Sequence, residues 1–230
     1  MADTVTVPQY AERVKTGFAV EARKYAVEAI GTFFLALAVA VSALSGSALT
    51  PLAAGAVLMV MVYAGGHISG GHYNPAVTMA VLVRRRIGIG EAVGYWVAQL
   101  VAGVIAGLVG RAIVDPTTVH TLTLSGRAFG AAAVAELLFT FALCWVVLNV
   151  ATSRDQTGNG FFGLAIGFTV AAGALAVGGI SGGSFNPAVT LGGAVGGLFA
   201  WSTLWIYFIV ELGAGVIAGL AFRALNPADK

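Results

Sequence analysis

Charged residues are scarce in this chain: Asp, Glu, Lys and Arg together make up only 10% of its 230 residues. Soluble globular domains carry about 25% of these residues, so the composition excludes an ordinary soluble domain. Apolar residues make up 58% of the chain. The net charge of +2 is too small to indicate nucleic-acid binding. The composition therefore predicts a protein that is embedded in the lipid bilayer.

Cysteine and histidine are also rare. Cys144 is the single cysteine, which excludes an intramolecular disulfide. His67, His72 and His120 stand at no metal-ligand spacing with Cys, Asp or Glu, so no metal site is predicted. The chain has no Ser-His-Asp, paired-carboxylate or phosphate-loop pattern. We therefore expect neither a cofactor nor enzyme activity.

The chain contains long runs of apolar residues. A helix needs about 20 apolar residues to cross the roughly 30 Å of hydrocarbon in a bilayer. Segments of this length lie at about 25–45, 49–66, 91–113, 129–151, 161–179 and 202–223. We predict an all-α membrane protein with a tail at 1–24, a single membrane domain at 25–223 and a tail at 224–230.

The triplet Asn-Pro-Ala occurs twice, at 74–76 and 186–188, each time after a glycine-rich stretch. Asn is favoured as a helix N-cap and Pro at the first helical position. The apolar stretches that begin there, about 74–83 and 186–196, are too short to cross, because ten helical residues reach only about 15 Å. We predict two half-membrane helices whose N-termini meet near the midplane.

The second half of the chain repeats the first. The heptapeptide 102–108 recurs residue for residue at 214–220, an offset of 112, and 186 minus 74 gives the same offset for the triplets. Each repeat, about 25–113 and about 129–223, holds three crossings. Three is an odd number, so the second copy is inverted in the membrane. The two triplets are therefore expected to approach each other from opposite faces.

Basic residues indicate the orientation. If the N-terminus is inside, only Arg111 and Arg127 fall outside. The residues on the inner side are Arg13, Lys15, Arg23, Lys24, Arg84, Arg85, Arg86, Arg154, Arg223 and Lys230. Cytoplasmic segments carry the excess of Lys and Arg, so we expect both termini in the cytoplasm, with the protein in the plasma membrane.

The glycine-rich stretches before the triplets must reach membrane depth without helical patterning. Irregular backbone is tolerated there only where it is buried in protein or lines a wet cavity. Carbonyls along a pore would accept hydrogen bonds from a passing solute. The amides of Asn74 and Asn186 would act as central donors, where two helix N-termini repel cations. A re-entrant loop without a pore explains one such stretch but not a symmetric pair.

Glu28 and Glu136 lie inside apolar spans and occupy equivalent places in the two repeats. An ionisable residue at such a place is a functional hypothesis. The interpretation we favour is that each accepts backbone N–H groups of an irregular loop, since such loops carry many unpaired donors. Gln99 and Glu211 are also repeat-related and either brace in a similar way or face a subunit contact.

Over nearly the whole chain, these motifs resemble those of the major intrinsic protein family, the aquaporins. The resemblance implies an aquaporin-like inverted repeat of six transmembrane helices plus two half-membrane re-entrant helices. It also implies a homotetramer with one pore per subunit, passive conduction of water or small neutral solutes, and Asn74 and Asn186 as the central donor pair. The carbonyls implied to line the path are those of Gly70, Gly71, His72, Gly182, Gly183 and Ser184.

The chain departs from the family pattern directly after the second triplet, where most members carry Arg and this chain has Val189. The other outer-filter positions are Ala54, Ala174 and Gly183, so all four are small or apolar. We therefore expect a wide, apolar filter that admits more than water. Val189 is similar to the residue of some plant vacuolar members, which the resemblance links to urea, ammonia and hydrogen peroxide.

Several alternatives stay open. His120 and Arg127, in the outer loop 114–128, are candidates to replace the missing donor at the mouth. A glycerol or polyol facilitator is disfavoured by Leu191, where such members usually have Asp. A structural membrane protein of the same fold would have a blocked lumen. A gated secondary transporter would need acids for coupling ions at the midplane, for which Glu28 and Glu136 are the candidates.

Overall fold

The computed structural model describes the backbone of residues 7–114 and 121–229, with side chains from residue 19 onward within these ranges. Six of its helices are long and apolar enough to span a membrane, as the sequence predicts. They are α1 (Val7–Leu44), α2 (Thr50–Ser69), α4 (Ile89–Ile113), α5 (Gly126–Val147), α6 (Phe162–Ser181) and α8 (Leu204–Leu225). The described residues form no β-strand, only an isolated bridge between Leu122 and Phe199.

The helix boundaries differ from the predicted spans at two places. α1 begins at Val7, so the described part of the predicted 1–24 tail continues the first span instead of forming a separate segment. α5 runs directly into a turn of π-helix at Leu148–Thr152. The other spans agree with the prediction to within a few residues, the precision expected of helix ends.

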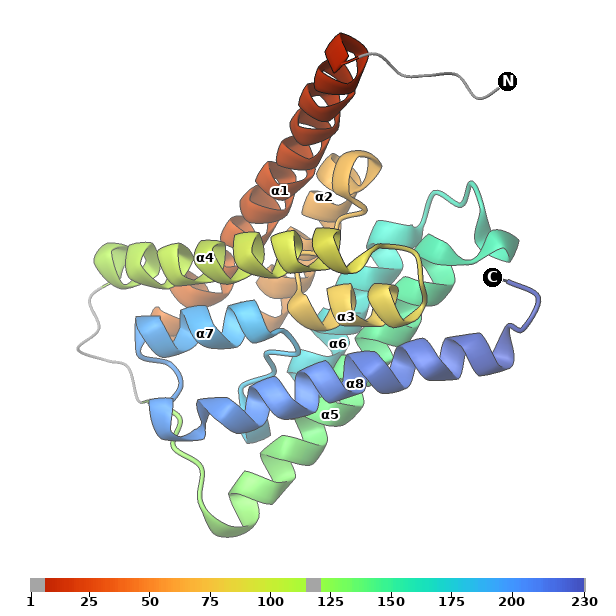
Figure 1. Cartoon of the computed structure of the whole chain (residues 1–230). Helices are drawn as coiled ribbons and strands as arrows, with labels where there is room; N and C mark the ends of the chain where they lie inside the picture. The colour runs from red at the N-terminus through yellow and green to blue at the C-terminus, as the bar shows by residue number, and fades with distance from the viewer. Residues whose placement is uncertain (1–6, 115–120, 230) are drawn as a thin grey trace.

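Two short helices complete the bundle: α3 (Pro75–Val83) after α2, and α7 (Pro187–Gly196) after α6. α3 packs mainly against α8, whereas α7 packs mainly against α4 and α1 (Figure 1). Each half-helix therefore packs on spans that belong to the other repeat. The two repeats are interlocked, and neither encloses its own half-helix.

The repeated heptapeptide explains how these contacts become so close. A methyl group added at Gly103 of α4 would lie 2.3 Å from the carbonyl oxygen of Ala188 in α7. One added at Gly215 of α8 would lie 2.4 Å from the carbonyl oxygen of Ala76 in α3. Small residues let helix backbones approach closely inside membranes. The heptapeptide is therefore the docking face for the opposite repeat's half-helix.

α2 and α6 cross at a second pair of repeat-related glycines. A methyl group at Gly55 would lie 2.5 Å from the Gly167 carbonyl oxygen, and one at Gly167 would lie 2.4 Å from the Gly55 carbonyl oxygen. The reciprocal contact joins residues that are 112 positions apart in the chain. It places the pseudo-two-fold axis of the inverted repeat at the crossing of these two helices.

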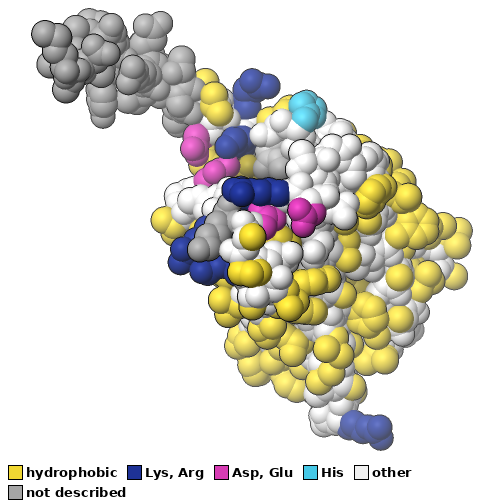
Figure 2. All heavy atoms as spheres, turned by 90° about the vertical axis from the view of Figure 1, so that its right-hand side faces the viewer, with side chains coloured by type: hydrophobic (Ala, Val, Ile, Leu, Met, Phe, Trp, Pro, Cys, Tyr) yellow, Lys and Arg dark blue, Asp and Glu magenta, His cyan; other side chains and the backbone are white. Residues whose placement is uncertain are grey.

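The surface is mostly apolar, and basic side chains gather near the end of the bundle that holds the C-terminus (Figure 2). Large exposed apolar residues occur on all six long helices, for example Ile30, Leu108, Leu138 and Leu220. Such a surface suits the lipid environment and would be unfavourable in water. Surface and helix lengths together indicate an integral membrane protein.

The glycine contacts make a direct prediction for α8. Gly215→Ala should lower the free energy of unfolding by roughly 1–3 kcal/mol, because the new methyl group meets the Ala76 carbonyl and overpacks the interface. Gly213→Ala, two residues away with no atom within 4 Å of the added methyl group, is the matched control. Thermal unfolding in detergent measures both. Equal unfolding temperatures for the two variants would contradict the docking role of Gly215.

Candidate functional site

The two half-helices begin with the same capping geometry. Asn74 and Asn186 are extended N-caps, and their side-chain oxygens accept from the backbone N–H groups of Ala76 at 2.8 Å and Ala188 at 3.0 Å. Proline occupies the first helical position in both, where its missing N–H group leaves no helical hydrogen bond unmade. Both helices therefore begin at the Asn-Pro-Ala triplets, as the sequence predicts.

The loops before the triplets share an unusual backbone. Gly70 and Gly71 have φ values of 89° and 64°, and Gly182 and Gly183 have φ values of 90° and 64°. These left-handed conformations are accessible to glycine without strain, which explains why the Gly-Gly pair occurs in both loops. The residues immediately before the two asparagines are also left-handed, at φ values of 49° and 52°. The two loops are thus near copies in conformation.

The two asparagines each bind the opposite loop. Asn74 Nδ2 donates to the carbonyl oxygen of Phe185 at 2.8 Å, and Asn186 Nδ2 donates to that of Tyr73 at 2.9 Å. An amide nitrogen carries two N–H groups, so each asparagine keeps one for another acceptor. Both side chains line the same buried cavity. The asparagines therefore join the two repeats and present a donor pair to one space.

Glu28 of α1 is fully buried and receives four hydrogen bonds. Its Oε1 accepts from Ser69 Oγ at 2.7 Å and from the backbone N–H of His72 at 2.9 Å. Its Oε2 accepts from the backbone N–H of Tyr73 at 2.6 Å and from Gln99 Nε2 at 2.8 Å. A buried carboxylate with this many donors is compensated for its loss of water. Glu28 thus holds the first loop from inside the bundle.

Glu136 of α5 occupies the equivalent place in the second repeat. Its Oε1 accepts from Ser181 Oγ at 2.6 Å and from the backbone N–H of Ser184 at 3.1 Å. Its Oε2 accepts from the backbone N–H of Phe185 at 2.8 Å. The residue equivalent to Gln99 is Glu211, a carboxyl group where the first repeat has an amide. Both glutamates therefore bind loops, the arrangement that bracing requires.

Six carbonyls of the two loops have no internal partner among the described residues, whereas the Tyr73 and Phe185 carbonyls accept from the asparagines. Within residues 19–114 and 121–229, none of the six carbonyls that the family resemblance assigns to the pore accepts a protein hydrogen bond. They belong to Gly70, Gly71, His72, Gly182, Gly183 and Ser184. Backbone carbonyls in folded proteins are paired with protein groups or with water, so these six are available to a solute or to water. In each loop, the N–H groups that precede the asparagine are thus paired, while three carbonyl oxygens are free within the described part of the chain.

A narrow buried cavity runs between the two loops. It offers about 20 Å³ to the centre of a water-sized sphere. One water molecule needs about 10–15 Å³ by this measure, so the cavity holds only one or two. Its polar lining is His72, Asn74, Ser184 and Asn186. Its apolar lining is Leu35, Val39, Ala54, Leu58, Val77, Leu143, Ile166, Val170 and Val189, with Gly183 between them.

The structure brings three of the four predicted outer-filter residues to the cavity. Ala54, Gly183 and Val189 line the cavity, whereas Ala174 does not and instead lies beside Gly183. The filter is apolar, and the cavity as a whole holds only one or two water molecules, so a wide outer filter stays a prediction. The prediction considered only the four small filter residues. Branched side chains elsewhere on the helices, for example Ile166 and Val170 of α6, also line the cavity and reduce its volume.

Of the two candidates for a mouth donor, the structure describes only Arg127, which lies away from this cavity. His120 falls outside the described residues. Arg127 is the second residue of α5, is exposed, and borders a shallow apolar surface formed by α5 and Val177. The structure therefore does not bring Arg127 into the cavity, and any effect of this residue on selectivity stays a prediction.

A wider vestibule of about 300 Å³ continues from the cavity toward the basic end of the bundle. His72 lines both spaces, and its Nδ1 lies 3.0 Å from Thr78 Oγ1. The vestibule wall also includes Gly70, Arg86 and Glu91. Lys24 pairs with Glu91 at its rim, at 2.7 Å. The lining thus changes from apolar to charged as the space widens.

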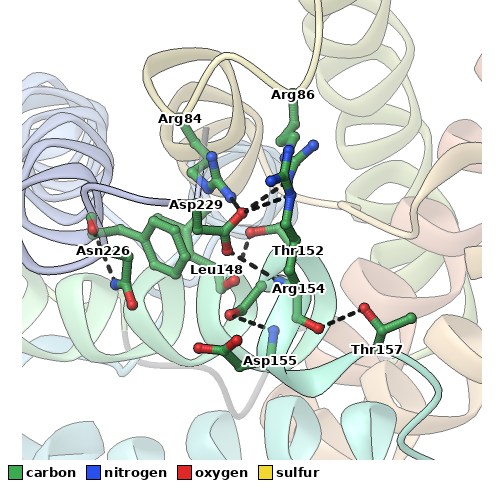
Figure 3. A network of polar contacts seen from close by, with 11 residues as sticks. Arg84, Arg86, Leu148, Thr152, Arg154, Asp155, Thr157, Asn226 and Asp229 are labelled. Carbon is green, nitrogen blue, oxygen red and sulfur yellow. Dashed lines mark hydrogen bonds and ion pairs between the residues drawn. The ribbon is translucent and has the colours of Figure 1, made fainter.

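Asp229 holds several arginines at this end (Figure 3). Its Oδ1 lies 2.8 Å from Arg84 Nη2, 3.1 Å from Arg86 Nη2 and 3.6 Å from Arg154 Nε. Its Oδ2 accepts from the backbone N–H of Arg154 at 3.0 Å. Arg84 is buried, with its guanidinium 4.4 Å from the centre of the Phe222 ring. We call these four charged residues the arginine clamp; it ties the C-terminal segment to the loops after α3 and α5.

Sequence reasoning missed the clamp and most of the apolar lining. The sequence indicates only a membrane orientation from Arg84, Arg86 and Arg154, and it places Asp229 in the predicted 224–230 tail. The signal that could have revealed Asp229 was its position as a lone acid beside an otherwise basic end. No comparable signal exists for Leu35 or Leu143, because their facing depends on how α1 and α5 rotate in the bundle.

The clamp predicts a pH-dependent stability. Burial raises the pKa of Asp229, but hydrogen bonds from Arg154 and Arg84 and the charge of Arg84 lower it further, so the pKa lies below its ordinary value. Stabilisation by a carboxylate with a lowered pKa is present above the unfolded value, about 3.9, and is lost as the pH falls through the folded value. Asp229→Asn should therefore lower the unfolding temperature at neutral pH, and its difference from wild type should shrink at acidic pH.

Asp155→Asn is the control for this measurement, since Asp155 is exposed and forms no ion pair with the described residues. Thermal unfolding in detergent from pH 7 downward compares the three proteins. An Asp229→Asn effect of constant size at every pH would contradict an electrostatic role for the clamp.

Comparison with known proteins identifies the family. The family model described as "Major intrinsic protein" matches residues 12–222. The chain belongs to the major intrinsic protein family. Its members are channels and not enzymes, and they carry water and small neutral solutes across membranes. The chain is thus an integral membrane protein of the aquaporin fold.

Relatives occur in bacteria and plants. The chain is 37% identical over 216 residues to "Glycerol uptake facilitator protein-like 6" of Lactiplantibacillus plantarum, covering 90% of this chain and all of that protein. It is 37% identical over 195 residues to "Aquaporin NIP2-1" of Oryza sativa subsp. japonica, covering 81% of this chain and 65% of that protein. "Probable aquaporin TIP4-1" of the same rice is 39% identical over 191 residues, with 82% and 74% covered.

A solved structure shows the same fold. The aquaglyceroporin from Plasmodium falciparum superposes with a TM-score of 0.71 at 18% sequence identity, covering 90% of this chain and 98% of that chain. At this identity the likeness concerns the fold alone. It agrees with the six long helices and two half-helices described above.

Proposed function

We propose that this chain is a passive channel for water and small uncharged solutes that excludes protons and ions at its two Asn-Pro-Ala motifs. The observation that carries the proposal is the pair of asparagine amides on one narrow cavity. Each amide has one N–H group bound to the opposite loop, which fixes its orientation. A second N–H group of each remains for a solute.

This arrangement explains how protons would be excluded. A water molecule that accepts from both asparagines offers its oxygen to them and turns its hydrogens away, which interrupts the donor-acceptor chain that proton hopping needs. The N-termini of α3 and α7 meet at the same place, and each contributes about half a positive charge. A cation at this point would therefore meet an unfavourable field without a compensating carboxylate.

The lining supports small solutes. The free carbonyls of the two loops would replace hydrogen bonds that a solute loses on leaving bulk water. Room for one or two water molecules favours water, and the apolar filter with Val189 is the basis on which urea, ammonia and hydrogen peroxide are proposed as further solutes. Val189, in place of the Arg of most members, leaves the outer filter without a fixed cation.

A glycerol or polyol facilitator is the second candidate. The name of one relative, "Glycerol uptake facilitator protein-like 6", favours it. The small cavity and Leu191 favour water. A poorly conducting structural membrane protein of the same fold would transport neither solute, so one experiment separates the three.

The remaining features of the proposal concern the setting of the channel. We propose that it is a homotetramer in the plasma membrane with both termini in the cytoplasm. The excess of arginine at the end that holds the clamp supports this orientation. Accessibility of a cysteine introduced next to the C-terminal segment, labelled from one side of intact cells, tests it.

Stopped-flow light scattering of proteoliposomes tests the transport proposal. We expect water to equilibrate faster than in empty liposomes, with urea and glycerol measured in the same preparation. If glycerol enters the proteoliposomes faster than urea does, the glycerol facilitator is favoured. No acceleration for water, urea, ammonia, hydrogen peroxide or glycerol would contradict the channel proposal and favour the structural protein.

Asn186→Asp tests the central barrier. The new carboxylate would lie where the two half-helix N-termini meet and would stabilise a cation there. We expect proton or sodium leak to rise at least about tenfold, which corresponds to a barrier lower by about 1.4 kcal/mol. A pH-sensitive dye inside proteoliposomes measures the leak. Asn149→Asp, on the π-helical turn after α5 and away from the cavity lining, is the control.

Val189→Arg tests the outer filter. The long cationic side chain would narrow the cavity and add donors, so we expect urea permeability to fall roughly tenfold, a barrier higher by about 1.4 kcal/mol, with water less affected. Thr123→Arg, at an exposed position before α5 and outside the cavity lining, is the control. Unchanged urea permeability in Val189→Arg would show that this position does not limit the solute.

A further inference from the structure

The two repeats bind their loops with the same contacts except at one position. In the first repeat, Gln99 Nε2 donates to Glu28 Oε2 at 2.8 Å and to Thr78 Oγ1 at 3.0 Å. In the second repeat, the position 112 residues later is Glu211. An amide that donates has therefore been replaced by a carboxyl group, which donates only when it carries a proton.

Glu211 is fully buried, and its two oxygens have different surroundings. Its Oε1 accepts from the backbone N–H of Asn186 at 3.2 Å and from Thr190 Oγ1 at 2.9 Å. Its Oε2 receives no hydrogen bond from the described residues. The repeat relation places it beside Glu136, since the equivalent Gln99 Nε2 lies 2.8 Å from Glu28 Oε2 in the first repeat. The oxygen without a donor thus occurs where the first repeat has an N–H group.

Two ionised carboxylates in contact inside the bundle would repel each other strongly. Among the described residues, neither Glu136 nor Glu211 forms an ion pair with Lys or Arg. The other titratable groups close by supply no positive charge: Tyr207 on α8 donates its hydroxyl to the Ser181 carbonyl, and Cys144 on α5 is a buried thiol. The pair therefore needs one proton between its two carboxyl groups.

The donors decide which residue holds that proton. Glu136 accepts three hydrogen bonds, from the Ser181 hydroxyl and from the backbone N–H groups of Ser184 and Phe185, so it is the better place for the negative charge. Glu211 accepts on one oxygen only. The proton therefore belongs on Glu211 Oε2, facing Glu136.

We propose that Glu211 is a neutral carboxylic acid whose Oε2–H group donates to Glu136, in the place that the Gln99 amide takes in the other repeat. Glu211 is a positioning residue and does not touch the solute. Its Oε1 holds the backbone of Asn186, and its proton holds Glu136, which holds the second loop. The inference rests on the proposed channel function only for its effect on permeability, because the proton itself can be observed in protein that conducts nothing.

Infrared spectroscopy of the purified full-length protein at pH 7 tests the proton. A carboxylic acid has a C=O stretch that an ionised carboxylate lacks, and exchange into heavy water shifts it. We expect this band in the wild type and its loss in Glu211→Gln, which supplies an amide as Gln99 does. A wild type without the band, or a band unchanged in Glu211→Gln, would overturn the proposal.

Water permeability per channel tests the positioning. We expect Glu211→Gln to stay within about twofold of wild type, and Glu211→Leu, which cannot donate or accept, to lose about fivefold or more through unpaired buried groups. Gln99→Glu is the reciprocal variant, and it should add a second carboxylic-acid band. If Glu211→Leu fails to fold, the carboxylic-acid band of the wild type and its loss in Glu211→Gln still test whether Glu211 carries the proton. Permeability lost equally in Glu211→Gln and Glu211→Leu would contradict the role of the proton.

Discussion

Interrupting a backbone inside a bilayer requires a partner for every polar group that the interruption exposes. Lipid offers none, and each unpaired group costs several kcal/mol. This protein interrupts its backbone twice at membrane depth, in the loops that precede α3 and α7. Glu28 and Glu136 bind the N–H groups of those loops. Three carbonyls of each loop remain without a protein partner among the residues that the structure describes, so they are available to a solute in the lumen.

The interlocking of the repeats depends on the same constraint. A half-helix whose N-terminus lies at the midplane needs close packing along its length. Each half-helix packs closely on the opposite repeat, at Gly103 for α7 and at Gly215 for α3. The asparagine side chains extend this exchange to the loops, since each donates to the other loop's carbonyl. The donor pair is therefore fixed by contacts between repeats, and neither repeat can form it alone.

Much of this architecture could be predicted from the sequence because its signals are local or periodic. Span lengths, the capping chemistry of Asn-Pro-Ala and the offset of 112 depend on residues near one another or on exact repetition. The width of the cavity could not be predicted in this way. It depends on Leu35, Leu143 and Ile166, whose facing is set by helix rotation and not by spacing from a motif. The arginine clamp was missed because one acid in a short tail forms no pattern.

An experimental structure at a resolution that shows ordered water would test the central claim most directly. The claim is that the loop N–H groups are bound by the two glutamates while the loop carbonyls and the asparagine amides face a solute path. It predicts a water molecule within hydrogen-bonding distance of both Asn74 Nδ2 and Asn186 Nδ2, with further waters beside the carbonyls of Gly71 and Gly183. A lumen closed by side chains, or a protein donor bound to the Gly71 or Gly183 carbonyl, would contradict it.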